Sequence, residues 1–363
     1  MPKRLIIAGG GTGGHIFPAV AIANAMMKLD PALTILFIGA KGKMEMEKVP
    51  KEGYRIIGID IAGFNRSSLI KNFSLPFKIV KSFVQVSEIF KGYRPDAVIG
   101  VGGYSTYPVL RYAQSKHLPT FIHESNSFAG KSNMLLGRKA TKIFVAGEGM
   151  EKFFPSEKMM ITGNPIRNSI AAGNISREEG AGYFKLDPTR KIVLVTGGSL
   201  GAKNINDAIA AAIGDFSANN LQVIWQTGKP YAADARQIST GRKNVWTNDF
   251  ITKMEYAFAA ADLVVSRSGA MAIAELSVVK KPVIFVPYPF AAEDHQTVNA
   301  KQLADKKAAL MIADAEARSN LVNTIIDLAL NQELQDELKE NIGKLGVTDA
   351  DQIIAKEILD TIK

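Results

Sequence analysis

The stretch RLIIAGGGTGG at residues 4–14 decides the fold class of this 363-residue chain. It joins a short apolar run to a glycine-rich turn, and residues 18–29 behind it have the composition of a helix. Glycines in such a turn let the backbone approach a ligand closely, and the start of the following helix offers unpaired N–H groups to a phosphate. The stretch KIVLVTGGSLGA at residues 191–202 repeats this order of features, which indicates two units that each open like a Rossmann-type domain.

Short apolar runs alternate with longer helical stretches along the rest of the chain, which is typical of parallel sheets with both faces covered. We predict buried strands at residues 4–8, 33–39, 97–101, 120–123 and 142–146, and in the second half at 191–196, 222–226, 263–266 and 282–286. The sequence therefore predicts an α/β protein with two Rossmann-like domains, residues 1–163 and 164–347. Apolar residues at helical spacing in the tail, 348–363, predict a final helix.

The composition excludes several kinds of protein. The chain has no cysteine, so it has no disulfides, thiolate metal sites or cysteine nucleophiles. It has no apolar run of about 18 residues, and the first strand begins at residue 4, so we expect neither a membrane span nor a signal peptide and a protein that stays inside the cell. The net charge of +9 favours anionic partners. Because the lysines are scattered among acids and no aromatic–basic platform is present, we expect no nucleic acid partner.

Two further glycine-rich turns follow predicted strands, GVGGY at residues 100–104 and GGSLG at residues 197–201. Loops at the carboxyl ends of parallel strands meet at one edge of a sheet. We therefore expect the two domains to present these loops on either side of a cleft that takes a phosphate-rich ligand.

A dinucleotide-dependent dehydrogenase is one alternative, because Gly9, Gly11 and Gly14 satisfy the pattern G-x-G-x-x-G. That fingerprint requires an acid at the end of the second strand, where this chain has Lys41, and Asp30 lies at the wrong end. A turn that serves only tight packing of strand and helix is a second alternative.

Polar side chains directly follow several of the strands, where α/β proteins place ligand contacts. His15 begins a helix whose positive end disfavours a charged imidazole, so a neutral proton acceptor and a capping histidine are both open. His123 and Glu124 are either ligand contacts or a buried pair that shapes its loop. Glu275 either reaches a ribose hydroxyl from the helix after Arg267 or is solvated.

Nothing in the sequence predicts a metal or another cofactor, because no histidine pair has ligand spacing. Asp349 and Asp351 have the spacing of a metal-binding D-x-D, but they begin the final helix, far from any glycine loop. We interpret them as capping and solvated residues.

Residues 64–95 combine one acid, Glu88, with six basic residues: Arg66, Lys71, Lys78, Lys81, Lys91 and Arg94. The predicted helix in this stretch carries two apolar stripes. The first stripe is Phe77, Val80 and Val84, and the second is Ile79, Phe83, Val86 and Phe90. One stripe packs on the core, and lysines that flank the second indicate a peripheral contact with an anionic membrane surface. The alternative is that both stripes are core and the lysines form a solvated rim.

Seven motifs together, in one order across nearly the whole chain, resemble a known family. They are residues 9–15 with Phe17 and Pro18, residues 100–104, His123 to Asn126, Gly163 to Arg167, residues 197–202, Arg267 to Ala270 with Glu275, and Asp294 with Gln296. Each motif is weak alone, but the set closely resembles the MurG family of peptidoglycan N-acetylglucosaminyltransferases. The resemblance implies a GT-B fold of two Rossmann-like domains, with the last helix packing back on the first domain.

The resemblance also implies a reaction. N-acetylglucosamine would pass from UDP-N-acetylglucosamine to the 4-hydroxyl of the muramyl sugar in undecaprenyl-pyrophosphoryl-muramyl-pentapeptide (lipid I), with inversion, to give lipid II. The enzyme would act as a peripheral protein on the cytoplasmic side of the inner membrane. His15 would be the general base, with Glu124 next in line, and Tyr104 would lie on the acceptor side.

The donor site implied by the resemblance draws on both domains. Ser199 and its neighbouring glycines would hold the diphosphate, and the backbone of Ile251 would read the uracil. Uridine would lie along Ala270, Met271, Ala272, Ile273, Ala274 and Glu275, with Glu275 on the ribose. The remaining donor contacts would come from Thr12, Gly13, Gly14, Asn126, Arg167 and Gln296.

This chain departs from the family pattern at Leu200 and His295, where the family often has glutamine, and these departures concern fine donor contacts. Two other functions stay open: a transferase with another lipid-linked acceptor, and a non-catalytic nucleotide-sugar-binding subunit that docks at the membrane. A pure binding subunit would not need His15.

Overall fold

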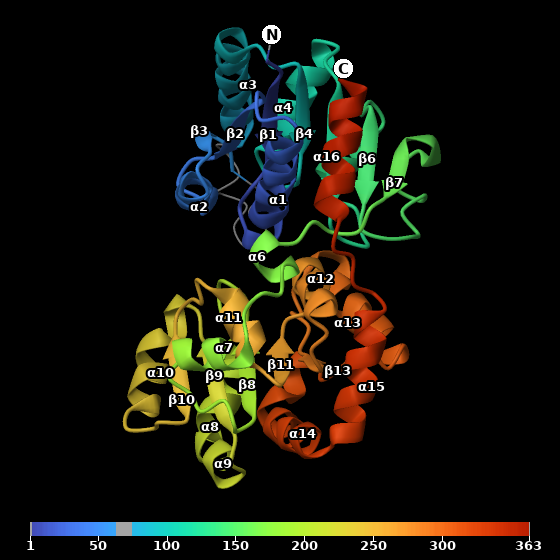
Figure 1. The fold of residues 1–363 in the computed structure, drawn as a ribbon. Coiled ribbons are helices and arrows are strands. Elements are labelled where there is room, and N and C mark those ends of the chain that lie inside the picture. Colours follow the sequence, from blue (N-terminus) through green and yellow to red (C-terminus); the bar gives the residue numbers. More distant parts are fainter. Residues whose placement is uncertain (1, 63–74, 363) are drawn as a thin grey trace. The chain divides into compact units, whose positions relative to one another are not determined.

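The computed structural model describes residues 2–62 and 75–362. The chain divides into two compact units, Met1–Arg167 with Thr348–Lys363 and Asn168–Val347. Figure 1 shows that each unit is built on a central sheet flanked by helices. The predicted α/β class and the two Rossmann-like domains are confirmed. The boundary at residues 163/164 and the cleft remain predictions.

In the described residues, the first unit contains a seven-stranded parallel sheet in the order β3-β2-β1-β4-β5-β6-β7. Ile6 of the central strand β1 lies opposite Leu36 of β2 and Val98 of β4. The strands are β1 (Arg4–Ala8), β2 (Thr34–Ala40), β3 (Arg55–Ile59), β4 (Ala97–Gly100), β5 (Thr120–Glu124), β6 (Lys142–Val145) and β7 (Met159–Ile161).

Helices cover both faces of this sheet. One core layer joins β1 to α1 and to α16 near the end of the chain, and Figure 1 shows these two helices side by side. The other layer joins the sheet to α3, α4 and α5. The helices are α1 (Gly13–Leu29), α2 (Glu45–Lys51), α3 (Leu75–Tyr93), α4 (Thr106–Ser115), α5 (Lys131–Gly137), the 3₁₀ turn η2 (Ser156–Lys158) and α16 (Ala350–Thr361).

The described second unit contains a six-stranded parallel sheet in the order β10-β9-β8-β11-β12-β13. Its strands are β8 (Ile192–Thr196), β9 (Gln222–Gln226), β10 (Val245–Asn248), β11 (Leu263–Ser266), β12 (Val283–Phe285) and β13 (Leu310–Met311). Its helices are α6 (Asn168–Ala171), α7 (Arg177–Tyr183), α8 (Lys203–Ala211), α9 (Ile213–Ala218), α10 (Ala232–Ser239), α11 (Met254–Ala260), α12 (Ala270–Val279), α13 (His295–Asp305), α14 (Ala317–Leu330) and α15 (Gln332–Gly343). Three short 3₁₀ turns are η3 (Lys229–Tyr231), η4 (Ala292–Asp294) and η5 (Asp314–Glu316).

All nine predicted strands are present within one residue of the predicted ends, and the described residues contain four further strands that were not predicted. The four are β3, β7, β10 and β13, and each lies at an edge of its sheet. An edge strand is only partly covered: no residue of β10 or β13 is fully buried, whereas every residue of β4 and β8 is. Such strands lack the continuous apolar run that marks a central parallel strand.

The first helix begins earlier than predicted. α1 starts at Gly13 rather than at residue 18, because the amides of His15 and Ile16 both bond to the carbonyl of Thr12. Gly13 and Gly14, the last glycines of the first loop, therefore belong to the first turn of α1. The unpaired amides of that turn lie at the carboxyl end of β1.

The prediction for the stripes of α3 was wrong in one respect. Val86 and Phe90 of the second stripe are buried in the core, whereas the first stripe, Phe77, Val80 and Val84, is exposed by 79%, 66% and 55%. The unpartnered apolar surface is therefore the first stripe. Residues 64–74 of the predicted stretch lie outside the described residues. Among the described residues, no helix combines the length and apolar character needed to cross a membrane.

Candidate active site

The first two glycine loops pack backbone against backbone at the carboxyl ends of β1 and β4. The amide of Gly10 donates to the carbonyl of Gly102 at 3.1 Å. A Cβ atom on Gly103 would lie 2.3 Å from the carbonyl oxygen of Gly10, and Gly103 has a φ of +92°. Only a glycine at position 103 fits this contact. The hydrogen bond and the close packing together fix the two loops relative to each other.

The imidazole of His15 is held by these two loops. Its Nδ1 donates to the carbonyl of Gly10 at 3.0 Å. A Cβ atom on Gly102 would lie 2.7 Å from Cδ2 and Nε2, so the ring packs closely on that glycine. A neutral histidine that is protonated at Nδ1 carries a lone pair on Nε2. The half-buried His15 is therefore arranged to accept a proton at Nε2.

The carboxylate of Glu124, the last residue of β5, organises the loop that follows it. Oε1 accepts the backbone and side-chain N–H groups of Asn126 at 3.1 and 3.2 Å. Oε2 accepts the amide of Gly130 at 3.0 Å and Nδ2 of Asn133 at 2.8 Å. Four donors on one buried carboxylate fix the path of the loop and the position of Asn126.

His123 lies behind this loop and is fully buried. Burial lowers the pKa of His123 to about 4, with a smaller contribution from the nearby His15. Its imidazole is therefore neutral near pH 7, and its place in the interior favours a packing role over contact with a ligand.

Most of the remaining predicted residues of this unit lie at the start of α1. The guanidinium of Arg167 stacks on the ring of Phe17 at 4.6 Å, and a Cβ atom on Gly13 would lie 3.0 Å from that ring. Thr12 is the exposed residue that precedes the helix, and Gly13 with Gly14 forms its first turn. Tyr104 follows the second loop and is 50% exposed. The structure thus brings Thr12, His15 and Arg167 to one helix end.

In the second unit, the buried side chain of Gln226 at the end of β9 connects two loops. Its Nε2 donates to the carbonyl of Gly198 and to Oγ1 of Thr196, both at 3.0 Å. Its Oε1 accepts the backbone amide of Ile251 at 2.9 Å. The glycine loop after β8 and the segment after β10 are therefore held by one carboxamide.

The third glycine loop approaches the backbone after β9 closely. A Cβ atom on Gly201 would lie 2.1 Å from the carbonyl oxygen of Thr227, and Gly201 has a φ of +78°. Ser199 is half-buried in this loop, and Leu200 is 78% exposed. Because Gly201 has no side chain, the loop can pack against this backbone and present its amides at the carboxyl end of β8.

The start of α12 lies beside the start of α13. Ser268 donates its hydroxyl to the carbonyl of Gln296 at 2.8 Å, and Asn299 donates to the carbonyl of Ser268 at 3.2 Å. The side chain of Gln296 accepts the amide of Tyr288 at 3.0 Å through Oε1, and its Nε2 faces Gly269, which precedes α12. Residues Ala270 to Ala274 form the partly buried first turns of α12, and Glu275 beyond them is buried.

The guanidinium of Arg267 is bonded to groups of the protein, which argues against a role in binding phosphate. Its Nη1 donates to the carbonyls of Val286 and Pro287 at 3.0 and 2.9 Å and to Oδ1 of Asp314 at 2.6 Å. Asp314 also accepts Nδ2 of Asn204 on α8 at 2.6 Å. This network ties the loops after β11 and β12 to the helix that follows the third glycine loop.

Sequence reasoning missed Gln226 and Asp314. Gln226 carried a usable signal, because it is a polar residue that ends a buried strand, as Glu124 is. Asp314 carried none, since it lies in a short turn whose partner Arg267 is 47 residues away along the chain.

The interpretation of Asp351 as solvated was wrong, because it is only 6% exposed and burial raises its pKa. Within the described residues, no cluster of histidines and acids has the arrangement of a metal site.

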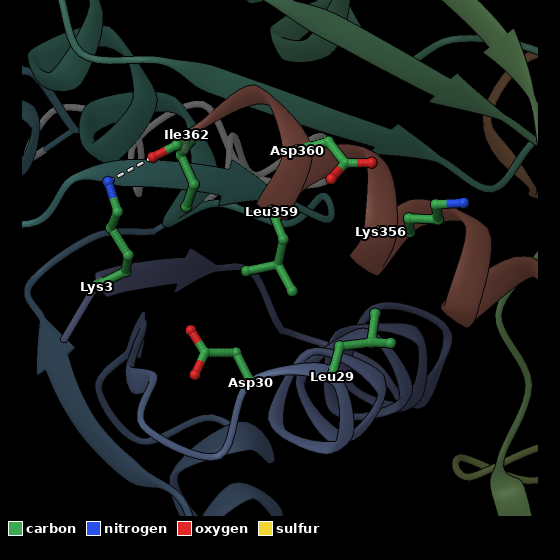
Figure 2. A pocket seen from close by; sticks show the side chains of 7 residues that line it. All are labelled: Lys3, Leu29, Asp30, Lys356, Leu359, Asp360 and Ile362. Carbon is green, nitrogen blue, oxygen red and sulfur yellow. Dashed lines mark hydrogen bonds between the residues drawn. The ribbon is translucent and has the colours of Figure 1, made fainter.

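A cavity of about 300 Å³ lies at the opposite end of β1 from the glycine loop (Figure 2). It is bounded by Lys3, Leu29, Asp30, Lys356, Leu359, Asp360 and Ile362, and Figure 2 shows Lys3 bonded to the carbonyl of Ile362.

Comparison with known proteins places this arrangement in a family. Residues 5–145 match the glycosyltransferase family 28 N-terminal domain, and residues 192–354 match the C-terminal domain of the same family. The chain is 47% identical over 358 residues to the UDP-N-acetylglucosamine–N-acetylmuramyl-(pentapeptide) pyrophosphoryl-undecaprenol N-acetylglucosamine transferase of Phocaeicola vulgatus, covering 98% of this chain and 95% of the relative. A crystal structure of Acinetobacter baumannii MurG superposes with a TM-score of 0.75 at 27% identity, covering 99% of this chain and all of that one.

The chain belongs to the MurG family. The transferase of the same name from Parabacteroides distasonis is 46% identical over 361 residues, which cover 99% of this chain and 98% of the relative. The predicted resemblance to the MurG family, its GT-B fold and its class of glycosyltransferase are confirmed. Membership of the MurG family also removes the dehydrogenase alternative that the first glycine loop left open.

Proposed function

We propose that this chain transfers N-acetylglucosamine from UDP-N-acetylglucosamine to the 4-hydroxyl of the muramyl sugar of lipid I, with inversion, and so forms lipid II. The observation that carries the proposal is the 47% identity, over nearly the whole length, to a transferase whose name specifies this sugar and this lipid-linked acceptor.

The second unit would hold the donor. Amides of the third glycine loop with Ser199, together with the start of α12, would bind the diphosphate, because both present N–H groups to an anion. The amide of Ile251 donates to Gln226, and the carbonyl of Ile251 would accept N3–H of the uracil. Residues Ala270 to Ala274 would line the uridine, Glu275 would bind the ribose, and Nε2 of Gln296 would donate to the sugar or phosphate.

The first unit would supply the proton acceptor. Nε2 of His15 would remove the proton of the 4-hydroxyl as the oxygen forms its bond to C1 of N-acetylglucosamine. The bond from C1 to the diphosphate oxygen breaks in the same displacement, and UDP leaves with the electron pair. Amides around the diphosphate stabilise the charge that develops there.

The other predicted residues of the first unit have supporting roles in this proposal. Thr12, Gly13, Gly14 and Arg167 lie at the start of α1, where they would complete the donor site, and Tyr104 would contact the acceptor. Glu124 accepts four hydrogen bonds, which favours a role in placing Asn126 over a role as the base.

The test is UDP release from UDP-N-acetylglucosamine with and without a short-chain lipid I analogue. We expect release that needs the analogue, and His15→Ala should slow it by roughly 100- to 10,000-fold while UDP binding is retained. The matched control is His117→Asn, because His117 is an exposed histidine in a left-handed turn that asparagine tolerates. Release that survives in His15→Ala would move the base elsewhere. Donor binding without release would favour another acceptor or a non-catalytic subunit.

The exposed stripe of α3 fits an anionic membrane surface, and we place the enzyme as a peripheral protein on the cytoplasmic face of the inner membrane. Phe77, Val80 and Val84 are exposed together, with Lys78 and Lys81 exposed on the same helix. On α5, which covers the same face of the sheet, Leu135 is 60% exposed beside exposed basic residues at both ends of the helix. Apolar side chains flanked by lysines enter the headgroup region of anionic bilayers.

The triple variant Phe77→Ser, Val80→Ser, Val84→Ser should lose co-sedimentation with phosphatidylglycerol vesicles and keep its melting temperature. The control is Leu330→Ser, which removes a leucine that is 72% exposed in the other unit. Unchanged co-sedimentation of the triple variant would remove α3 from the membrane contact.

A further inference from the structure

A buried carboxylate from α2 reaches the first glycine loop. Glu45 is only 1% exposed, although it lies in the charged segment EMEK at residues 45–48. Its Oε2 accepts the amide of Gly11 at 2.7 Å, and its Oε1 accepts the amide of Ala40 at 2.9 Å. Both oxygens are thus held by the backbone at the carboxyl ends of β1 and β2.

The peptide unit between Gly10 and Gly11 joins this carboxylate to His15. The N–H of the unit belongs to Gly11 and donates to Glu45. The carbonyl of the same unit belongs to Gly10 and accepts Nδ1 of His15 at 3.0 Å. Carboxylate, peptide and imidazole therefore form one continuous chain of hydrogen bonds.

The surrounding glycines make room for this chain. A Cβ atom on Gly10 would lie 2.2 Å from the carboxyl carbon of Glu45, and Gly10 has a φ of +145°. A Cβ atom on Gly39 would lie 2.5 Å from Cγ of Glu45. A side chain at either position would displace the carboxylate, so the glycines serve Glu45 as well as the close approach of the loops.

We propose that Glu45 is a positioning residue for His15, acting through the Gly10–Gly11 peptide. The inference rests on the proposed function, in which His15 is the general base. A carboxylate bonded to the N–H polarises the peptide and makes its carbonyl a stronger acceptor, because hydrogen bonds in a chain reinforce one another. The stronger acceptor holds the proton on Nδ1, orients the ring, and stabilises the imidazolium that forms when Nε2 takes the proton of the acceptor hydroxyl.

The first test is Glu45→Gln, which keeps the shape of the side chain but removes its charge and turns one acceptor into a donor that faces a backbone N–H. We expect kcat to fall roughly 10- to 100-fold, the range found when a group that orients a metal-binding histidine is changed. The Kd for UDP should change much less than kcat, because the uridine and diphosphate contacts proposed for the second unit are untouched. The matched control is Glu47→Gln, an exposed glutamate on the same helix, which should keep full kcat.

A double-mutant cycle separates positioning from general damage. If Glu45 acts through His15, Glu45→Gln causes no further loss in the His15→Ala background, since the residues act as a unit. An equal loss in both backgrounds, or full kcat in Glu45→Gln, would overturn the inference. Full activity of His15→Ala would instead overturn the proposed role of His15, which keeps the two failures distinct.

Imidazole NMR supplies a measurement that does not depend on activity, because it reports the tautomer of His15 directly. In the wild type, the signal that is lost in His15→Ala should show a protonated Nδ1 and an unprotonated Nε2 at neutral pH. In Glu45→Gln, that Nδ1–H signal should move or broaden by exchange. A wild-type His15 without a proton on Nδ1 would contradict the chain of hydrogen bonds.

Discussion

Oε1 of Gln226 accepts the backbone amide of Ile251 at 2.9 Å. The same carboxamide donates through Nε2 to the carbonyl of Gly198 in the third glycine loop. The third glycine loop, which would bind the diphosphate, and Ile251, which would bind the uracil, are therefore held at a fixed distance from each other. Gln226 holds them without being a proposed contact of UDP itself.

Gln226→Ala should weaken UDP binding by roughly 10-fold or more, because an unsatisfied buried amide costs about 1–3 kcal/mol and frees both loops. Isothermal titration with UDP measures this. The control is Gln222→Ala at the other end of β9, where the side chain of an equally buried glutamine bonds to the backbone of Asp187. Equal losses of UDP affinity in both variants would show that Gln226 has no special place at the donor site.

Gly103→Ala should lower kcat by about 100-fold and leave UDP binding intact, because the new methyl group would displace the Gly10 carbonyl that orients His15. The comparison is Gly42→Ala, which also has a positive φ, +70°, but has nothing within 4 Å of the added methyl group. That variant should lose only about 1 kcal/mol of stability and retain kcat. Steady-state kinetics and thermal melts distinguish the two.

His123 should make the first unit sensitive to acid. Its pKa is lowered from 6.5 to about 4 in the folded state, so between these values the unfolded chain binds more protons and stability falls as the pH falls. The loss amounts to about 3 kcal/mol by pH 4. The difference between wild type and His123→Gln in urea unfolding from pH 7 to pH 4 isolates this contribution from the carboxylates. A difference that does not vary with pH would contradict the lowered pKa.

Asp314→Asn should destabilise the second unit by about 2–4 kcal/mol, because it leaves the largely buried Arg267 without its carboxylate. UDP binding should weaken as well, since Arg267 holds the carbonyls of Val286 and Pro287 beside the start of α13. Urea unfolding and UDP titration measure the two effects. Glu340→Gln, which removes an exposed ion pair with Lys344, should leave both unchanged, and a similar loss there would refute the argument from burial.

The predictability of each strand follows from its place in the sheet. β4 and β8 are buried on both faces, so their sequences are continuous apolar runs. β10 at an edge has no fully buried residue, and its four residues, VWTN, form no continuous apolar run. The same reasoning explains the stripes of α3. The apolar spacing indicates two apolar faces, and only the packing of α3 against the sheet and α4 decides which face is buried.

Sequence alone determined the two Rossmann-like units, the glycine loops and the family, because these depend on local patterns that recur in order along the chain. Only the tertiary structure decided which polar groups form hydrogen bonds and ion pairs with one another. Glu45 reads as a solvated helix residue, yet it lies buried against Gly10 because two glycines leave space for it. Gln226 and Ile251 meet because the neighbouring strands β9 and β10 end side by side, and Arg267 and Asp314 meet past the carboxyl end of β12, which lies between β11 and β13. Such contacts join residues that are distant along the chain, and no local pattern encodes the geometry of their meeting.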